Sequence, residues 1–171
     1  MTPPAPQHLG SEISIGMSAY GNASITRQSL EALFQAAEGP FELILVDDCS
    51  PDNGETLELF RGTRALHPNT KLFSFQRNLE YTGSLNCILS HATGAFVLFL
   101  SNDVSVTPGY IREIFRAARS DPSFGIVDWP RRIPVQIAVP LSWGACPHSS
   151  EIAVTRVTQG YCSFRWRRSW P

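Results

Sequence analysis

The stretch FELILVDDCSPDNG, Phe41–Gly54, decides the fold of this 171-residue chain. Its unbroken apolar run from Leu43 to Val46 is typical of a strand that is covered on both faces, as in a parallel sheet between two helix layers. Ser50-Pro51 follows and indicates a helix N-cap with proline at the first helical position. The stretch therefore predicts a strand from Phe41 to Asp47 that leads into a helix.

The same alternation continues on both sides of this stretch. Further strands are predicted at Ile13 to Met17, Lys71 to Phe75, Ala95 to Leu100 and Phe124 to Val127. Segments with apolar residues at helical spacing separate them, and Gly94 is expected to cap the helix before the Ala95 strand. Regular β-α alternation predicts an α/β fold, with a mainly parallel sheet and helices on both faces.

The alternation stops after about Pro130. We expect residues 1–12 to be a disordered N-terminus, residues 13–130 to form one domain, and residues 131–171 to form an irregular tail. Within the tail, Ile133 to Val139 indicates an isolated strand. Two origins of the tail stay open: it is read out of frame from a longer gene, or it is a genuine irregular extension.

Composition limits the classes of partner and the cell compartment to be expected. The 14 basic and 15 acidic residues nearly cancel, so no basic excess points to nucleic acid, and any phosphate must be bound by local groups. None of the four cysteines lies in a C-x-x-C pair, which disfavours a zinc or redox motif. The longest apolar run is shorter than the roughly 20 residues that span a bilayer. A cytoplasmic location is expected, with peripheral contact at the inner face of the membrane left open.

Polar residues follow three of the predicted strands, where ligands of parallel sheets bind. The three segments are Ser18 to Asn22, Asp47 to Asp52 and Ser101 to Asp103. A carboxylate such as Asp48 can accept a hydrogen bond from the N3–H of a pyrimidine, and the ring of Tyr20 can stack on the base. Mg²⁺ or Mn²⁺ prefers one or two carboxylates together with phosphate oxygens and water, and Asp103 can supply one carboxylate.

Three segments together resemble the signatures of family 2 inverting glycosyltransferases, which have the GT-A fold. They are ISIGMSAYGN from Ile13, ELILVDDCSPDNG from Glu42, and NLEYTGSLNCILSHATGAFVLFLSNDV from Asn78. The resemblance covers about Ile13 to Val127. It implies sugar transfer with inversion from a UDP- or dTDP-sugar to a glycan or lipid-linked acceptor, assisted by Mg²⁺ or Mn²⁺. The Ser-Asn-Asp triplet is similar to the N-N-D form of rhamnosyltransferase-like members.

The resemblance also implies roles for individual residues. The donor-binding set that it implies is Ser18, Tyr20, Asp47, Asp48, Asn78, Gly83 and Asn102. Within this set Ser18, Tyr20 and Asp48 contact the base, and Asp47 supports that turn. Asp103 is implied as the metal ligand.

Three departures from the family pattern stand out. Ser101 replaces the first carboxylate of D-x-D, which predicts weaker metal binding, and Glu80 stands where glycine is usual. The segment that carries the catalytic base in the family is not recognisable, so no catalytic residue is assigned and a C-terminal truncation is expected. Two functions therefore stay open: a glycosyltransferase, and a non-catalytic nucleotide-binding fragment of one.

Two other nucleotide-binding classes are disfavoured. A dinucleotide-dependent oxidoreductase needs G-x-G-x-x-G in the first β-α turn, whereas Met17 to Asn22 contains one glycine. The sequence also lacks the G-x-x-x-x-G-K-[ST] signature of a P-loop enzyme.

Overall fold

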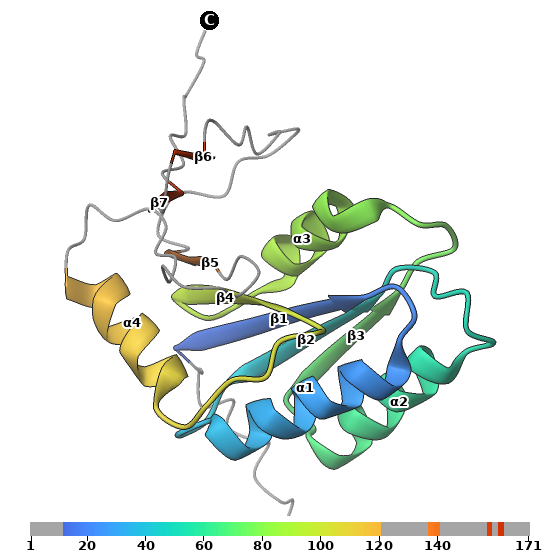
Figure 1. Cartoon of the computed structure of the whole chain (residues 1–171), viewed down its shortest axis with the longest axis horizontal. Helices are drawn as coiled ribbons and strands as arrows, with labels where there is room; N and C mark the ends of the chain where they lie inside the picture. Colours follow the sequence, from blue (N-terminus) through green and yellow to red (C-terminus); the bar gives the residue numbers. More distant parts are fainter. Residues whose placement is uncertain (1–11, 121–136, 141–156, 159–160, 163–171) are drawn as a thin grey trace, which may run out of the picture.

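The computed structural model describes residues 12–120, 137–140, 157–158 and 161–162. At its centre is a five-stranded sheet with the order β3-β2-β1-β4-β5 (Figure 1). The strands are β1 (Ile13–Ala19), β2 (Glu42–Asp47), β3 (Thr70–Ser74), β4 (Phe96–Ser101) and β5 (Ile137–Pro140). β1 to β4 are parallel and β5 is antiparallel to β4. The predicted mainly parallel α/β fold is confirmed.

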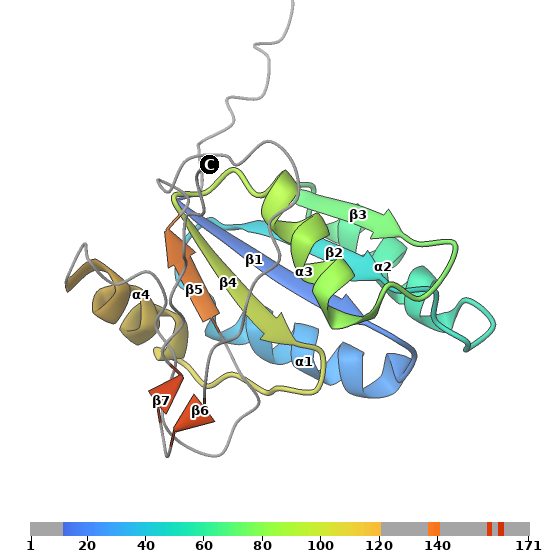
Figure 2. The same cartoon turned by 90° about the horizontal axis from the view of Figure 1, so that it is seen from above.

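Helices cover both faces of this sheet (Figures 1 and 2). They are α1 (Ala23–Ala36), α2 (Glu55–Leu66), α3 (Glu80–His91) and α4 (Tyr110–Ser120). The buried residues of α1, α2 and α4 share one apolar cluster with the sheet, and those of α3 share another. α3 lies alone on its face because the chain reverses direction across the sheet between β3 and β4, and right-handed crossovers then change face. None of the described helices is long and apolar enough to cross a membrane.

The predicted start of α2 at Ser50-Pro51 is wrong. The helix begins at Glu55, where the Asp52 carboxylate accepts hydrogen bonds from the N–H (3.1 Å) and the hydroxyl (2.5 Å) of Thr56. Ser50 has a different partner, because its hydroxyl oxygen accepts the N–H of Gly21 at 2.8 Å. A serine that matched a local cap motif therefore connects two loops.

The predicted C-terminal cap at Gly94 is also wrong, because α3 ends at His91 and Ala92 has an extended backbone. Gly94 instead lets the start of β4 pass close to β1. Its N–H donates to the Ser14 hydroxyl at 2.9 Å, and a Cβ at this position would lie 2.7 Å from the Ser14 nitrogen. Such an overlap with backbone atoms excludes any side chain here.

The C-terminal strands differ from the prediction in part. The strand expected at Ile133 to Val139 is not isolated, because Ile137–Pro140 pairs with β4 as β5. A two-stranded hairpin of β6 (Val157–Thr158) and β7 (Tyr161–Cys162) follows. The strand predicted at Phe124 to Val127 lies outside the described residues, as do residues 1–11 and most of the predicted tail.

β1 brings small residues to the face that α3 covers. Side chains alternate between the faces of a strand, so Ser14, Gly16 and Ser18 point to the same side. Ile88 of α3, which is 1% exposed, occupies the space above Gly16. A Cβ at Gly16 would overlap the Ile88 methyl Cγ2 and lie 2.9 Å from Cδ1. Glycine at this position therefore sets how closely α3 approaches the sheet.

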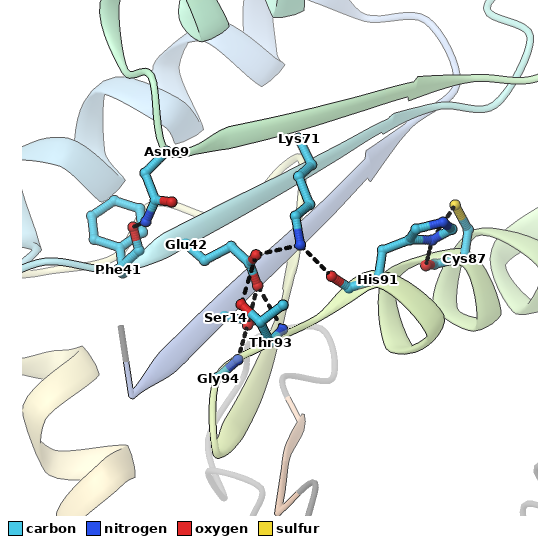
Figure 3. A network of polar contacts seen from close by, with 9 residues as sticks. All are labelled: Ser14, Phe41, Glu42, Asn69, Lys71, Cys87, His91, Thr93 and Gly94. Atoms are coloured by element: carbon cyan, nitrogen blue, oxygen red, sulfur yellow. Dashed lines mark hydrogen bonds and ion pairs between the residues drawn. The ribbon is translucent and has the colours of Figure 1, made fainter. Parts of the chain in front are cut away.

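A buried carboxylate network closes the opposite edge of the sheet from the strand ends that carry the predicted site (Figure 3). Glu42, 3% exposed, pairs with the Lys71 ammonium at 2.6 Å and accepts from the Ser14 hydroxyl at 2.5 Å. It also accepts from the N–H and the hydroxyl of Thr93, at 2.8 and 2.9 Å. Lys71 further donates to the His91 carbonyl at 2.6 Å, which attaches the C-terminus of α3 to β3.

The close contact at Gly16 can be tested by adding one methyl group. We expect Gly16→Ala to lower the free energy of unfolding by about 1–3 kcal/mol, because the added methyl group forces the buried side chain of Ile88 to shift. Gly62→Ala is the control, since Gly62 lies inside α2 with nothing within 4 Å of the added Cβ. It should raise stability by about 0.5–1 kcal/mol. Urea denaturation measures both, and equal effects would contradict the proposed contact.

The Glu42 network makes stability depend on pH. Burial raises the pKa of the Glu42 carboxyl, but Lys71 and the hydrogen bonds from Ser14 and Thr93 outweigh it, so this pKa is lowered from 4.5. A lowered folded-state pKa stabilises the fold above pH 4.5, and the contribution disappears as pH falls through the folded-state value.

We expect Glu42→Gln to cost about 1–3 kcal/mol at pH 7 and to flatten the loss of stability below pH 4.5. Glu58→Gln, in an exposed pair with Arg61, should change neither quantity appreciably. Thermal unfolding between pH 3 and pH 7 is the measurement. If stability falls as steeply with decreasing pH in Glu42→Gln as in the unchanged protein, Glu42 is not the cause of the pH dependence.

Candidate functional site

The loops that follow β1, β2 and β4 meet at the carboxyl edge of the sheet. From β1 the chain runs to β2 and β3 on one side, and it then returns to β4 on the other side of β1. The strand order therefore switches at the β1/β4 boundary, which is the usual ligand position in such sheets. In the strand register Ser18 is opposite both Val46 and Ser101. Because side chains alternate along a strand, Ser18 and Ser101 lie on the face that carries α3.

Asp48 follows directly after β2 and is 4% exposed. Its N–H donates to the Ala19 carbonyl at 2.9 Å, and its Oδ1 accepts the Leu79 N–H at 2.7 Å. No described residue donates to Oδ2. A nearly buried carboxylate therefore has one oxygen committed to the entry of α3 and one available as an acceptor.

Asp47 is 5% exposed, and the protein uses both of its side-chain oxygens. Oδ1 accepts the Ser50 N–H and Oδ2 accepts the Ser74 hydroxyl, each at 3.1 Å. Cys49 has a positive φ of 61°, so the chain turns sharply after Asp48. This geometry makes Asp47 a support for the turn that presents Asp48.

Tyr20 lies at the rim of the same edge and is 51% exposed. The next residue, Gly21, donates its N–H to Ser50, which ties the loop after β1 to the loop after β2. The loop that carries Tyr20 is therefore attached to the loop that follows Asp48, and half of the Tyr20 side chain is accessible to a ligand.

Asn78 and Gly83 belong to the entry of α3. The side-chain oxygen of Asn78 accepts the Glu80 N–H at 2.6 Å, and Glu80 has a positive φ of 59°. Gly83 lies inside the helix, where a Cβ would overlap the Cβ of Leu79. Both residues thus shape the turn that Asp48 holds, and the left-handed backbone explains why glycine would be favourable at position 80.

Ser101 to Val104 form a tight turn that exposes Asp103. The Val104 N–H donates to the Ser101 carbonyl at 3.3 Å, and the Ser101 hydroxyl donates to Asp103 Oδ1 at 2.5 Å. Asn102 points away from the open edge, because its side-chain nitrogen donates to the Thr26 hydroxyl at 2.9 Å. The turn therefore offers one carboxylate, partly held by Ser101.

This donor set fits a divalent cation only in company with a ligand. Among the described residues no group of three or more His, Cys, Asp or Glu side chains could hold a metal ion. Mg²⁺ is commonly bound by one or two carboxylates plus substrate phosphates. Asp103 alone therefore suits an ion that arrives with a diphosphate, and not a permanently bound metal.

Three functional candidates in the structure have weak signals in the sequence. Thr26 and Ser29 of α1 are buried and contact Asn102. In the sequence they are two hydroxyl residues on an otherwise apolar helix face, a pattern that predicts no function. Arg77 is exposed, lies close to Leu79 along the chain, and forms no ion pair within the described residues. It is a cation free to meet a phosphate.

A groove of about 590 Å³ lies elsewhere, between α1 and α2. None of the residues predicted from the sequence to bind the donor or the metal lines it. The loops of Asp48, Tyr20 and Asp103 are the better candidate site than this open groove. They bring together an acceptor, an aromatic ring and a carboxylate, which are groups that a nucleotide and a metal ion need.

Comparisons with known proteins identify the family of this chain. The family described as Glycosyl transferase family 2 matches residues 14–142. EpsE of Bacillus subtilis is 33% identical over 89 residues, which are 52% of this chain and 31% of EpsE. ExoO, a succinoglycan biosynthesis protein of Rhizobium meliloti, is 25% identical over 118 residues, which are 69% of this chain and 32% of ExoO. The chain thus spans about a third of the length of these curated relatives.

Solved structures show the same fold. The mannosyltransferase PcManGT from Pyrobaculum calidifontis, in complex with GDP-Man and Mn²⁺, superposes with a TM-score of 0.64 at 22% identity, over 71% of this chain and 36% of that one. S. aureus TarS 1–349 in complex with UDP has a TM-score of 0.54 at 25% identity, over 62% and 31%. The α/β sheet is therefore of the GT-A kind.

The positive φ of Glu80 gives a prediction about stability. We expect Glu80→Gly to raise the free energy of unfolding by about 0.5–1 kcal/mol. Glycine avoids the penalty of about 1–2 kcal/mol for a left-handed backbone. Part of this gain is lost because glycine gives the unfolded chain more conformational entropy. Glu55→Gly, at the first position of α2, is the control and should lower stability by about 0.5–1 kcal/mol. Urea denaturation distinguishes them, and two losses of equal size would disprove the strained backbone.

Proposed function

Because the chain belongs to glycosyl transferase family 2, we propose that it binds a nucleoside-diphosphate sugar at the carboxyl edge of its sheet and serves sugar transfer with inversion. The observation that carries the proposal is the convergence of three loops there. One presents the Tyr20 ring, one the open oxygen of Asp48, and one the Asp103 carboxylate. These groups match the base and the diphosphate of such a donor.

The geometry of Asp48 favours a uracil or thymine base. The pyrimidine N3–H is a single donor, and Asp48 Oδ2 is a single open acceptor, since Leu79 already uses Oδ1. The edge of guanine presents two adjacent donors, which suit a carboxylate with both oxygens open. TarS has been solved with UDP and with UDP-GlcNAc, whereas PcManGT has been solved with GDP-Man. We therefore assign a UDP- or dTDP-sugar as the donor.

Asp103 would hold a Mg²⁺ or Mn²⁺ ion that also contacts the diphosphate. When bound, such an ion supplies Lewis acidity that stabilises the departing diphosphate. The Ser101 hydroxyl in place of a second carboxylate lowers the negative charge of the turn, which favours an ion brought by the donor. The exposed guanidinium of Arg77 can add charge complementarity for the phosphates.

The remaining parts of the reaction belong to the same proposal. Transfer with inversion requires a carboxylate base within about 2.6–3.2 Å of the acceptor hydroxyl. We assign no residue to that role. The similarity of Ser101 to Asp103 with an N-N-D triplet supports a deoxyhexose such as rhamnose as the sugar, with a glycan or lipid-linked acceptor. A cytoplasmic site of action stays a prediction.

Binding of UDP tests the base contact. We expect the protein to bind UDP more tightly than CDP, because the N3 of cytosine is an acceptor that repels the Asp48 carboxylate. Asp48→Asn keeps an oxygen for the Leu79 N–H and turns its amide nitrogen toward the base. It should weaken UDP binding by about tenfold or more and narrow or reverse the preference over CDP. Calorimetry is the measurement.

The metal contact is tested in the same titrations. UDP binding should strengthen with Mn²⁺ in the unchanged protein and lose this gain in Asp103→Asn, while Mn²⁺ alone should give little binding. Glu38→Gln is the matched control, because it removes an exposed carboxylate that lies between the end of α1 and the start of β2, at the opposite edge of the sheet. A UDP affinity that is indifferent to both Asp48→Asn and Asp103→Asn would refute the site. Release of nucleoside diphosphate from sugar donors, with and without acceptors, separates transfer from nucleotide binding alone.

A further inference from the structure

We propose that Thr26 is a positioning residue that fixes the turn carrying Asp103, and that it thereby determines how strongly a divalent cation assists donor binding. The inference rests on the proposed function. Thr26 lies in the first turn of α1 and is completely buried. Its hydroxyl donates to the Asn22 carbonyl at 3.0 Å and accepts from the Asn102 side-chain nitrogen at 2.9 Å.

A second hydroxyl of α1, that of Ser29, also holds Asn102. Ser29 is three positions beyond Thr26 on the same helix face and is 2% exposed. Its hydroxyl donates to the Asn102 backbone carbonyl at 2.8 Å. α1 therefore holds Asn102 by both its side chain and its peptide group. Val104 is buried on the other side of the turn, and Asp103 is the exposed residue among its four.

The chemistry of the turn makes this support necessary. A site with two carboxylates can fix an ion from two directions, whereas Asp103 is the one carboxylate of the turn from Ser101 to Val104. The position of a single ligand relative to the diphosphate must then be set by the residues behind it. The Ser101 hydroxyl fixes one Asp103 oxygen, and the contact between Thr26 and Asn102 fixes the backbone that carries it.

The same hydroxyl also connects the two halves of the site. Thr26 bonds the Asn22 carbonyl, which ends the loop that carries Tyr20, and it bonds Asn102 in the loop that carries Asp103. A base stacked on Tyr20 and a diphosphate at Asp103 belong to one ligand. The spacing of these two contacts therefore depends on one buried threonine.

Thr26→Val removes the hydroxyl and keeps the shape of the side chain. UDP binding to the full chain is measured by calorimetry with and without Mn²⁺. In Thr26→Val we expect the gain in affinity from Mn²⁺ to fall about tenfold, as is typical when a residue behind a metal ligand is removed. Affinity without Mn²⁺ should stay within about twofold, because Asp48 is untouched and the backbone N–H of residue 26 still donates to the Asn22 carbonyl at 3.0 Å, which holds the loop of Tyr20. Thr26→Ser restores the hydroxyl and should restore the gain.

Thr63→Val is the matched control. Thr63 is also a buried threonine on a helix, and its hydroxyl donates to the Leu59 carbonyl at 2.9 Å, without contact to the turn at Asp103. It should keep the full gain from Mn²⁺. If Thr26→Val does not fold, Asn102→Ala removes the same hydrogen bond from its more exposed end and should show the same loss.

The outcomes separate the two proposals. A gain from Mn²⁺ that is unchanged in both Thr26→Val and Asn102→Ala overturns the role of Thr26 and leaves the donor site intact. An equal loss in Thr63→Val overturns it as well, because the effect would then be general destabilisation. If the unchanged protein binds no UDP at all, the proposed function fails, and this inference fails with it.

Discussion

The close approach of α3 to β1 is the constraint on which the rest of the structure depends. It is possible because Gly16 leaves room for Ile88. The two ends of the helix are then fixed by charge: Asp48 accepts the N–H of Leu79 at its start, and the Glu42 network holds the chain just beyond its end. Asp48 therefore places the helix and is also the residue that we propose to bind the base, whereas Glu42 serves helix placement alone.

The two faces of the sheet position different residues of the candidate site. On the α3 face, packing and polar contacts set the position of Asp48. On the α1 face, two buried hydroxyls set the turn that carries Asp103. β1 lies between these faces and contributes small residues to one and apolar residues to the other. Because β1 packs against both helices, it fixes the distance between the Asp48 turn and the Asp103 turn, which we propose to contact the base and the diphosphate.

The strands and the residues at their ends could be predicted because both are local properties. Apolar runs mark β1 to β4, and polar residues directly after a strand must lie at its carboxyl edge. The helix caps predicted at Ser50 and Gly94 are wrong because the actual partners of these residues are distant in sequence. These partners are Gly21 and Ser14. The apolar run from Ile133 to Val139 marks a strand there, but the pairing of β5 with β4 has no local signal. Thr26 gives no signal either, since a hydroxyl that satisfies a distant amide resembles any helix threonine.

The strand order also has a consequence for the sequence of folding events. β1, β2 and β3 are consecutive in the chain and pair as nearest neighbours, so this half of the sheet needs only short loop closures. β4 must return across the sheet to the free edge of β1, which is a pairing of much greater sequence separation. During synthesis from the N-terminus we expect the Asp48 turn to take shape before the Asp103 turn has left the ribosome. The turn proposed to read the base would then exist for a time without the turn proposed to bind the diphosphate.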